Sequence, residues 1–222
     1  MAARAATSPS SPDDETPSSS SSSAFSDLPI AQVLPQCLAA LERGHLVLEA
    51  PPGAGKTTAL PLELLAADPP WLQRKALVVV EPRRLATSAA ARRMTSLLSH
   101  LRGEKLRLGK RGCPVGYAVR GDARCSFADA RVVVVTPGVA TRLLLEEFGR
   151  NGDDDETSSS PPVRRRRRRL FASPIGAVML DEAHERSAEV DMLFALLAAR
   201  SKSEPKSKAR SSGNPMRVIF AS

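Results

Sequence analysis

The sequence predicts an α/β fold in which a mostly parallel sheet carries helices on both faces. Two observations predict it. Short apolar runs with the length of buried strands alternate along the chain with stretches of helical periodicity, as in parallel-sheet proteins. A glycine-rich loop also follows one predicted strand and opens one predicted helix. The 222 residues are about one domain's worth, and a hydrophobic fraction of 42% is enough for a packed core.

The pattern of apolar residues sets the expected elements in order. Met94, Leu97, Leu98 and Leu101 show helical spacing, and Ser187 is a suitable N-cap for a last helix. The expected helices cover 30–41, 56–67, 84–101, 139–148 and 188–199. The expected strands cover 46–50, 76–81, 115–119, 131–135, 177–180 and 216–221.

Three segments stand outside this pattern. We expect residues 1–27 to be a disordered tail, because a segment rich in Ser and Pro buries too little apolar surface to offset its ordering entropy. A transit peptide would fit the Ser-rich start, but the acidic run 13–15 argues against it. Residues 150–169 and 201–215 are expected to be low-complexity insertions on the surface. The six arginines 164–169 fit RNA binding or nuclear import as well as a neutral insertion.

Composition narrows the functional classes. Aromatic residues make up only 4%, which argues against an RNA module built on exposed stacking rings. No run reaches the roughly 18 apolar residues that a membrane span needs. The three cysteines fit neither a zinc site nor a disulfide framework and favour a reducing compartment, which leaves cytoplasm, nucleus and organelle open. Residues 28–149 carry a net charge of +7, which favours a polyanionic partner.

The segment Pro51-Pro52-Gly53-Ala54-Gly55-Lys56-Thr57-Thr58 has the features of a phosphate-binding loop. Its glycines allow a tight turn that brings backbone N–H groups onto phosphates, and the following helix N-terminus adds positive potential. In such a loop Lys56 reaches the β- and γ-phosphates and the Thr57 hydroxyl ligates Mg²⁺. The usual first glycine is replaced here by Ala50, and we expect the two prolines to supply the bend.

Val178-Met179-Leu180-Asp181-Glu182 is an apolar strand that ends in two carboxylates. Ligands of parallel sheets lie beyond the carboxyl ends of the strands, so the acidic pair and the phosphate loop are expected to face one site. We expect Asp181 to hold Mg²⁺ through water, and Glu182 to orient and activate an attacking water. Together the two motifs predict nucleotide hydrolysis.

Five motifs, in order and correctly spaced, resemble those of the DEAH-box RNA helicases. Asp181-Glu182-Ala183-His184 resembles motif II, and the loop from Ala50 resembles that of the bacterial HrpB-type branch, which also has Ala at its first position. The other matching segments are 81–86 (motif Ia), 115–120 (the segment that follows it), 136–142 (motif Ib) and 218–222 (the strand into motif III). The resemblance covers 28–222 apart from the insertions and implies a RecA-like P-loop NTPase domain.

The resemblance also implies roles for the matching residues. The expected ATP- and Mg²⁺-binding residues are Gly53, Ala54, Gly55, Lys56, Thr57, Thr58 and Asp181, with Arg93 stacking on the nucleobase. The expected catalytic set is Glu182, Asp181, Lys56 and His184, of which His184 links the ATP site to motif III. RNA contact is implied for Arg84 and Thr136, and more weakly for Arg83, Arg120 and Arg142. Gly121 and Pro137 depart from the family's usual residues.

Helicases of this family need two RecA-like lobes, and the resemblance implies that this chain holds the first, cut after motif III, of a longer parent chain. The second lobe brings an arginine finger worth roughly 10³–10⁵ in rate. We therefore expect the chain alone to hydrolyse ATP slowly and not to unwind duplexes. Single-stranded RNA is the expected partner, and the sequence leaves DNA open. Two alternatives remain: a P-loop ATPase that acts as a switch on another protein, and a noncatalytic RNA-binding fragment.

Overall fold

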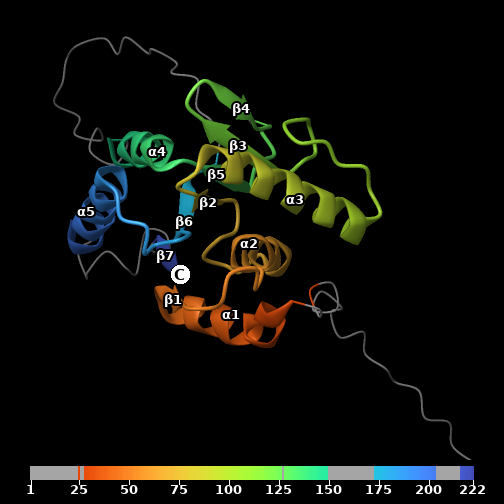
Figure 1. The fold of residues 1–222 in the computed structure, drawn as a ribbon, viewed down its shortest axis with the longest axis horizontal. Coiled ribbons are helices and arrows are strands. Elements are labelled where there is room, and N and C mark those ends of the chain that lie inside the picture. Colours follow the sequence, from red (N-terminus) through yellow and green to blue (C-terminus); the bar gives the residue numbers. More distant parts are fainter. Residues whose placement is uncertain (1–24, 26–27, 127, 150–172, 204–215) are drawn as a thin grey trace, which may run out of the picture.

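The computed structural model describes residue 25 and residues 28–126, 128–149, 173–203 and 216–222 (Figure 1). The predicted tail, apart from Phe25, and nearly all of the two predicted insertions lie outside the described residues. The strands are β1 (Leu46–Leu48), β2 (Ala76–Val80), β3 (Val115–Val119), β4 (Asp122–Arg124), β5 (Val132–Val135), β6 (Ile175–Leu180) and β7 (Arg217–Ala221). The helices are the 3-10 helix η2 (Pro29–Gln32), α1 (Leu34–Arg43), α2 (Lys56–Ala67), α3 (Arg84–Arg102), α4 (Pro137–Gly149) and α5 (Ala188–Ser203).

The described strands form one seven-stranded sheet in the order β1-β7-β6-β2-β5-β3-β4. Every neighbouring pair is parallel except β3 and β4, which form an antiparallel hairpin at the edge. The sheet is therefore mostly parallel, as predicted. Its central strand, β2, lies between β6 and β5, and the carboxyl ends of six strands meet at one edge.

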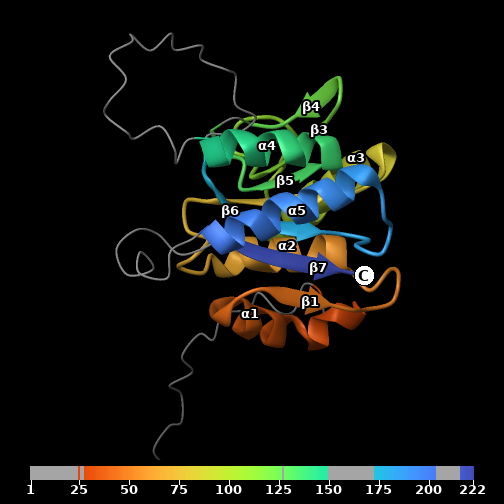
Figure 2. The ribbon, with the colours of Figure 1, turned by 90° about the vertical axis from the view of Figure 1, so that its left-hand side faces the viewer.

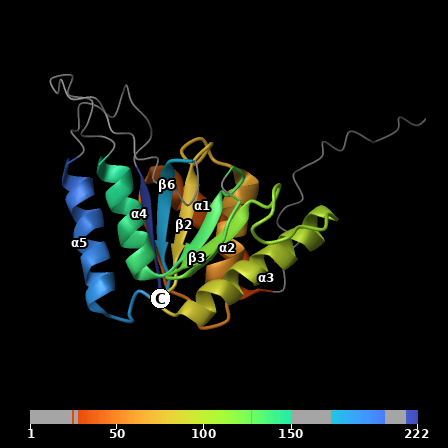
Figure 3. The ribbon, with the colours of Figure 1, turned by 90° about the horizontal axis from the view of Figure 1, so that it is seen from above.

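Helices cover both faces of the sheet (Figure 3). One core lies between the sheet and α1, α2 and α3, and includes Leu77 and Val79. A second core lies under α4 and α5 and includes Val78 and Val80. Figure 2 shows α4 and α5 side by side on that second face. Because both faces are covered, all five residues of β2 are buried, which explains the continuous apolar run. No helix in the described part of the chain is long and apolar enough to cross a membrane.

The observed elements differ from the predicted ones mainly at their ends. The first helix is split into η2 and α1, because Pro35 is tolerated only in a first turn and a new helix starts at Leu34. Ser187 caps α5 as predicted, its Oγ accepting the Val190 N–H at 3.2 Å. The hairpin strand β4 was not predicted; all three of its residues are exposed, so it carries no apolar signal.

Arg217 fastens the edge of the sheet that lies opposite the strands' carboxyl ends. Its guanidinium, on the buried start of β7, donates to the carbonyls of Leu41 at 2.9 Å and Glu42 at 3.2 Å, at the end of α1. It also lies over the ring of Trp71, 5.7 Å from the ring centroid. One buried cation thus joins α1, the segment before β2, and β7.

We expect Arg217→Met to lower the free energy of unfolding by about 2–3 kcal/mol, because two carbonyls lose a charged donor. Urea unfolding followed by circular dichroism measures the change. Arg102→Met, at the exposed end of α3, is the control and should change stability by less than about 0.5 kcal/mol. Equal effects of the two substitutions would contradict the assigned role of Arg217.

Candidate functional site

The loop between β1 and α2 makes a tight turn at its two prolines. The Ala54 N–H donates to the Pro51 carbonyl at 3.2 Å, which closes a four-residue turn with Pro52 second and Gly53 third. Gly53 has a φ of 79°, the positive value that a type II turn requires at its third position. The prolines therefore supply the bend despite Ala50, as the sequence predicted.

Gly55, the N-cap of α2, is fixed both by its backbone and by its surroundings. Its φ of 99° favours glycine, and a Cβ there would lie 2.8 Å from Leu28 Cδ1 and 3.2 Å from Ile30 Cγ2. The Ile30 N–H donates to the Ala54 carbonyl at 3.2 Å. The segment around η2 thus braces the loop from behind.

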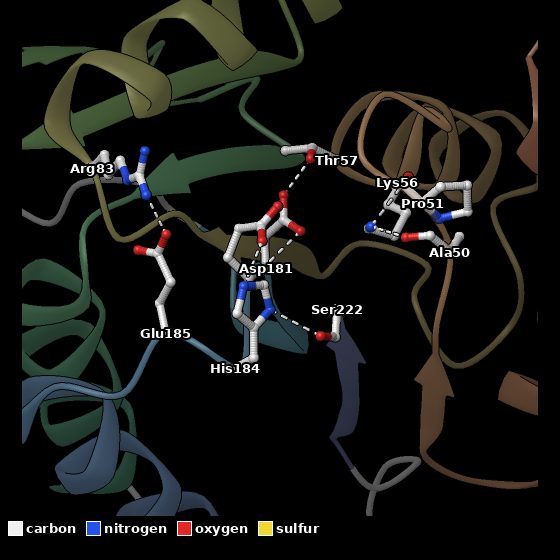
Figure 4. A network of polar contacts seen from close by, with 10 residues as sticks. Ala50, Pro51, Lys56, Thr57, Arg83, Asp181, His184, Glu185 and Ser222 are labelled. Carbon is white, nitrogen blue, oxygen red and sulfur yellow. Dashed lines mark hydrogen bonds and ion pairs between the residues drawn. The ribbon is translucent and has the colours of Figure 1, made fainter.

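The first residues of α2 carry the polar groups of the loop. The buried Lys56 places its Nζ on the Ala50 carbonyl, with the Pro51 carbonyl 3.5 Å away. The Thr57 hydroxyl donates directly to Asp181 Oδ2, which comes from the carboxyl end of β6 (Figure 4). The two motifs, 124 residues apart in the chain, are thus in contact.

The chain turns sharply after β6. Glu182 has a φ of 49°, in the left-handed region that non-glycine residues rarely enter. Its N–H donates to Asp181 Oδ1 at 3.0 Å, and its carbonyl accepts the Glu185 N–H at 2.7 Å. Such backbone strain persists where the surroundings impose it and is frequent at functional sites.

His184 bridges this turn to the end of β7. Its Nδ1 lies 2.9 Å from Ser222 Oγ (Figure 4). Its Nε2 lies 3.3 Å from Glu182 Oε2. The backbones are joined as well, because the Ala183 N–H donates to the Ala221 carbonyl at 2.9 Å. A movement of the β7 end would therefore reach the Glu182 side chain through His184.

Glu81, directly after β2, adds a third carboxyl group beside this pair. Burial raises its pKa to about 7, and the nearby carboxylates of Asp181, Glu182 and Glu185 act in the same direction. A backbone hydrogen bond from Arg83 partly opposes the rise in pKa. The concentration of negative charge around Asp181 suits a cation.

A groove of about 780 Å³ lies at the same sheet edge, beyond β3 and β5. Three arginines line it, Arg84, Arg120 and Arg142, together with Thr136. Arg84 Nη2 donates to the Arg120 carbonyl at 2.8 Å, and the Thr136 carbonyl accepts the N–H groups of Val139 and Ala140 in the first turn of α4. The lining also includes the acidic residues Asp122 and Glu189. A groove with three cations and a helix N-terminus suits a polyanion.

Arg83 does not line the groove. Its Nη2 pairs with Glu185 Oε1, on the turn after β6 (Figure 4). The segment from Glu81 to Arg84 therefore runs between the acidic pair and the groove, and contacts both.

The comparisons with known proteins agree with this geometry. A family model described as DEAD/DEAH box helicase matches residues 31–211. The chain belongs to the DEAD/DEAH box helicase family. It is 39% identical over 174 residues to the ATP-dependent RNA helicase HrpB of Escherichia coli, a match that covers 78% of this chain and 17% of HrpB.

Two further relatives are more distant. A putative DEAH-box ATP-dependent helicase of Mycosarcoma maydis is 33% identical, over 75% of this chain and 10% of its own length. The human ATP-dependent RNA helicase DHX33 is 30% identical, over 79% of this chain and 20% of its own length. The helicase domain described here thus spans a fifth or less of these three relatives.

The structure brings most of the predicted site residues of this helicase domain to one edge. The turn is formed by Gly53, Ala54 and Gly55. Next to it, Lys56 contacts the loop carbonyls and Thr57 contacts Asp181. Glu182 joins this group through contacts with Asp181 and His184. Thr58 is buried with its hydroxyl 3.5 Å from the Gly55 carbonyl. Arg93 is exposed on α3, and no described hydrogen bond or ion pair joins it to the loop.

Two acidic residues of the site were not singled out from the sequence. Glu81 could have been found as a carboxyl group that ends a wholly buried strand. Glu185 carries no such signal, because its pairing with Arg83 depends on β2 and β6 being neighbours in the sheet. Its role becomes visible only in the fold.

We expect Glu81 to make the helicase domain less stable as pH rises from about 5 to 7.5. The folded carboxyl group, with a pKa of about 7, keeps its proton where the unfolded one, near 4.5, has lost it. Folding then takes up a proton, so the free energy of unfolding falls through this range. Glu81→Gln should remove this loss, which urea unfolding at the two pH values measures. Glu104→Gln, exposed after α3, should keep the wild-type pH dependence.

Proposed function

We propose that this chain is the ATP-binding first lobe of a DEAH-box helicase, which couples Mg-ATP hydrolysis to movement along RNA or to its unwinding. The observation that carries the proposal is the contact between Thr57, at the start of α2, and Asp181, at the end of β6. A loop that binds phosphates and a carboxylate that holds the metal must meet in this way for nucleotide hydrolysis.

The phosphate-binding role rests on the loop. The backbone N–H groups of Gly53, Ala54 and Gly55 and the N-terminus of α2 would hold the phosphates. Lys56 would leave the carbonyls of Ala50 and Pro51 and bind phosphate oxygens instead. Thr58 would help to hold the phosphates. Arg93 would stack on the nucleobase, as the family resemblance implies.

The residues fit a Mg²⁺ ion. No group of three or more His, Cys, Asp or Glu side chains among the described residues is arranged to hold a metal alone. Mg²⁺ at nucleotide sites needs only one or two protein ligands beside phosphates and water. The Thr57 hydroxyl and the Asp181 carboxylate, which touch, would be those ligands. When bound, the ion would neutralise charge that develops on the phosphates.

Glu182 would orient and activate the attacking water. Its backbone is left-handed, and His184 Nε2 lies 3.3 Å from its carboxylate. His184 would pass the state of this site to motif III through Ser222. Glu182 would thus serve hydrolysis, and His184 and Ser222 would connect it to the end of β7.

The groove would bind the nucleic-acid backbone. Arg84, Arg120 and Arg142 would neutralise phosphates, and Thr136 would donate a hydrogen bond to one. Arg83 lies at the border of the groove. Backbone contacts carry little sequence information, so we infer binding to single-stranded RNA without strong sequence preference. Whether DNA binds as well depends on contacts to the 2′-hydroxyl.

We infer a domain that begins near residue 28, with the Ser/Pro-rich tail before it and two insertions within it. A second RecA-like lobe would bring the arginine finger and further nucleic-acid contacts. Since such a finger is worth roughly 10³–10⁵ in rate, this lobe alone would hydrolyse ATP slowly. It would not unwind a duplex.

Mg-ATP binding should depend on Lys56 and should tighten with RNA. Calorimetry of the 222-residue chain is expected to show binding that Lys56→Ala weakens at least about tenfold, because a charged donor to the phosphates is lost. Lys75→Ala, before β2 and remote from the loop, is the control. Binding unaffected by Lys56→Ala would contradict the phosphate role. Binding that RNA does not change would favour a non-helicase ATPase switch.

RNA affinity should depend on the groove. Arg84→Ala is expected to weaken binding of single-stranded oligouridine and to lower the salt dependence by about one phosphate contact. Fluorescence anisotropy at several salt concentrations measures both, with the exposed Arg102→Ala as the control. If deletion of residues 164–169 removes RNA affinity and Arg84→Ala does not, the binding surface is the arginine-rich insertion instead.

A further inference from the structure

The two consecutive arginines after β2 have different partners. Arg84 reaches into the groove and bonds to the Arg120 carbonyl. Arg83 turns to the other side and pairs with Glu185, on the turn that carries Asp181 and Glu182 (Figure 4). Arg83 therefore lies one residue from a groove suited to phosphates, with its charge held by a carboxylate.

The pair of Arg83 and Glu185 is weak enough to be exchanged. The Arg83 side chain is 72% exposed and that of Glu185 is 33% exposed. Ion pairs in such positions contribute about 0–1 kcal/mol, because water screens both charges. A phosphate offers arginine two acceptor oxygens, and its binding releases counterions from the nucleic acid. A backbone phosphate beside Arg84 can thus displace Glu185.

The consequences of that exchange reach the acidic turn. The Glu185 N–H bonds to the Glu182 carbonyl at 2.7 Å, within the turn where Glu182 is left-handed. The charges of Asp181, Glu182 and Glu185 all act on the carboxyl group of Glu81, which also accepts a hydrogen bond from the backbone N–H of Arg83. Among the described residues, Arg83 is the one cation paired with Glu185, so releasing Glu185 changes the charge balance of these carboxylates.

We propose that Glu185 is an internal competitor of nucleic-acid phosphates for Arg83. In this role Glu185 is a positioning residue: it lowers the affinity of the groove for nucleic acid and links that affinity to the nucleotide site. The inference rests on the proposed function, because it requires nucleic acid in the groove. It assigns the regulation of that site to one exposed ion pair.

The test measures binding of the 222-residue chain to fluorescein-labelled oligouridine of about 20 nucleotides. This length exceeds the stretch of single strand that one small binding domain usually covers. Glu185→Gln is expected to tighten binding up to about fivefold, because the competitor for Arg83 is removed. Arg83→Ala is expected to weaken binding and to lower the salt slope by about one. In the Arg83→Ala background, Glu185→Gln should have no effect.

A matched control separates competition from general charge. Asp191→Asn breaks the exposed pair of Arg186 and Asp191, 2.9 Å apart, with the same change in net charge. The proposal is overturned if this control tightens binding as much as Glu185→Gln, or if Glu185→Gln acts equally without Arg83. If the wild-type chain binds no oligouridine, the proposed RNA function fails together with the competition. If it binds and the variants do not behave as expected, only the competition fails.

The link to the nucleotide site has its own readout. Coupling between two ligands is reciprocal. The factor by which oligouridine changes the affinity for Mg-ATP therefore measures the coupling between the groove and the nucleotide site. Glu185→Gln is expected to move that factor toward one, while Asp191→Asn leaves it at the wild-type value. An unchanged factor in Glu185→Gln, measured by calorimetry, would overturn the link.

Discussion

The parallel pairing of β2 with β6 and with β5 is the constraint on which the rest of this structure depends. Parallel neighbours end at the same edge, so whatever follows them must share that edge. The pairing brings Asp181 beside Glu81 and places Thr136 on the other side of the same central strand. If β2 were parallel to one of these neighbours and antiparallel to the other, β5 and β6 would end at opposite edges, and the acidic pair would lie far from the groove.

The short segment after β2 carries both acidic and basic side chains. Glu81 is buried among carboxylates, Arg83 balances one of them, and Arg84 serves the groove. Under the proposed function, these adjacent residues would give a direct route between the nucleotide and the nucleic acid, without a long pathway through the core. The proposed basis is the exchange of one surface ion pair for another, which would cost little free energy and would respond to salt.

Local signals in the sequence were enough to predict much of this fold. The apolar runs of β2 and β5, the glycines at 53 and 55, and the carboxylates after β6 each report their own surroundings. The hairpin strand β4 could not be predicted, because its exposed residues carry no apolar pattern. The Arg83–Glu185 pair and the raised pKa of Glu81 also escaped prediction, since the pair depends on β2 and β6 being neighbours and the pKa depends first on burial in the folded domain.

The brace behind Gly55 bears on where this domain can be said to start. The match to the family model begins at residue 31, yet Leu28 and Ile30 lie before that point and fill the space beside Gly55. A chain that began at residue 31 would keep the loop residues 50–58 and lose the packing of Leu28 and Ile30 beside Gly55. The residues that pack against this loop thus extend further upstream than the family model does.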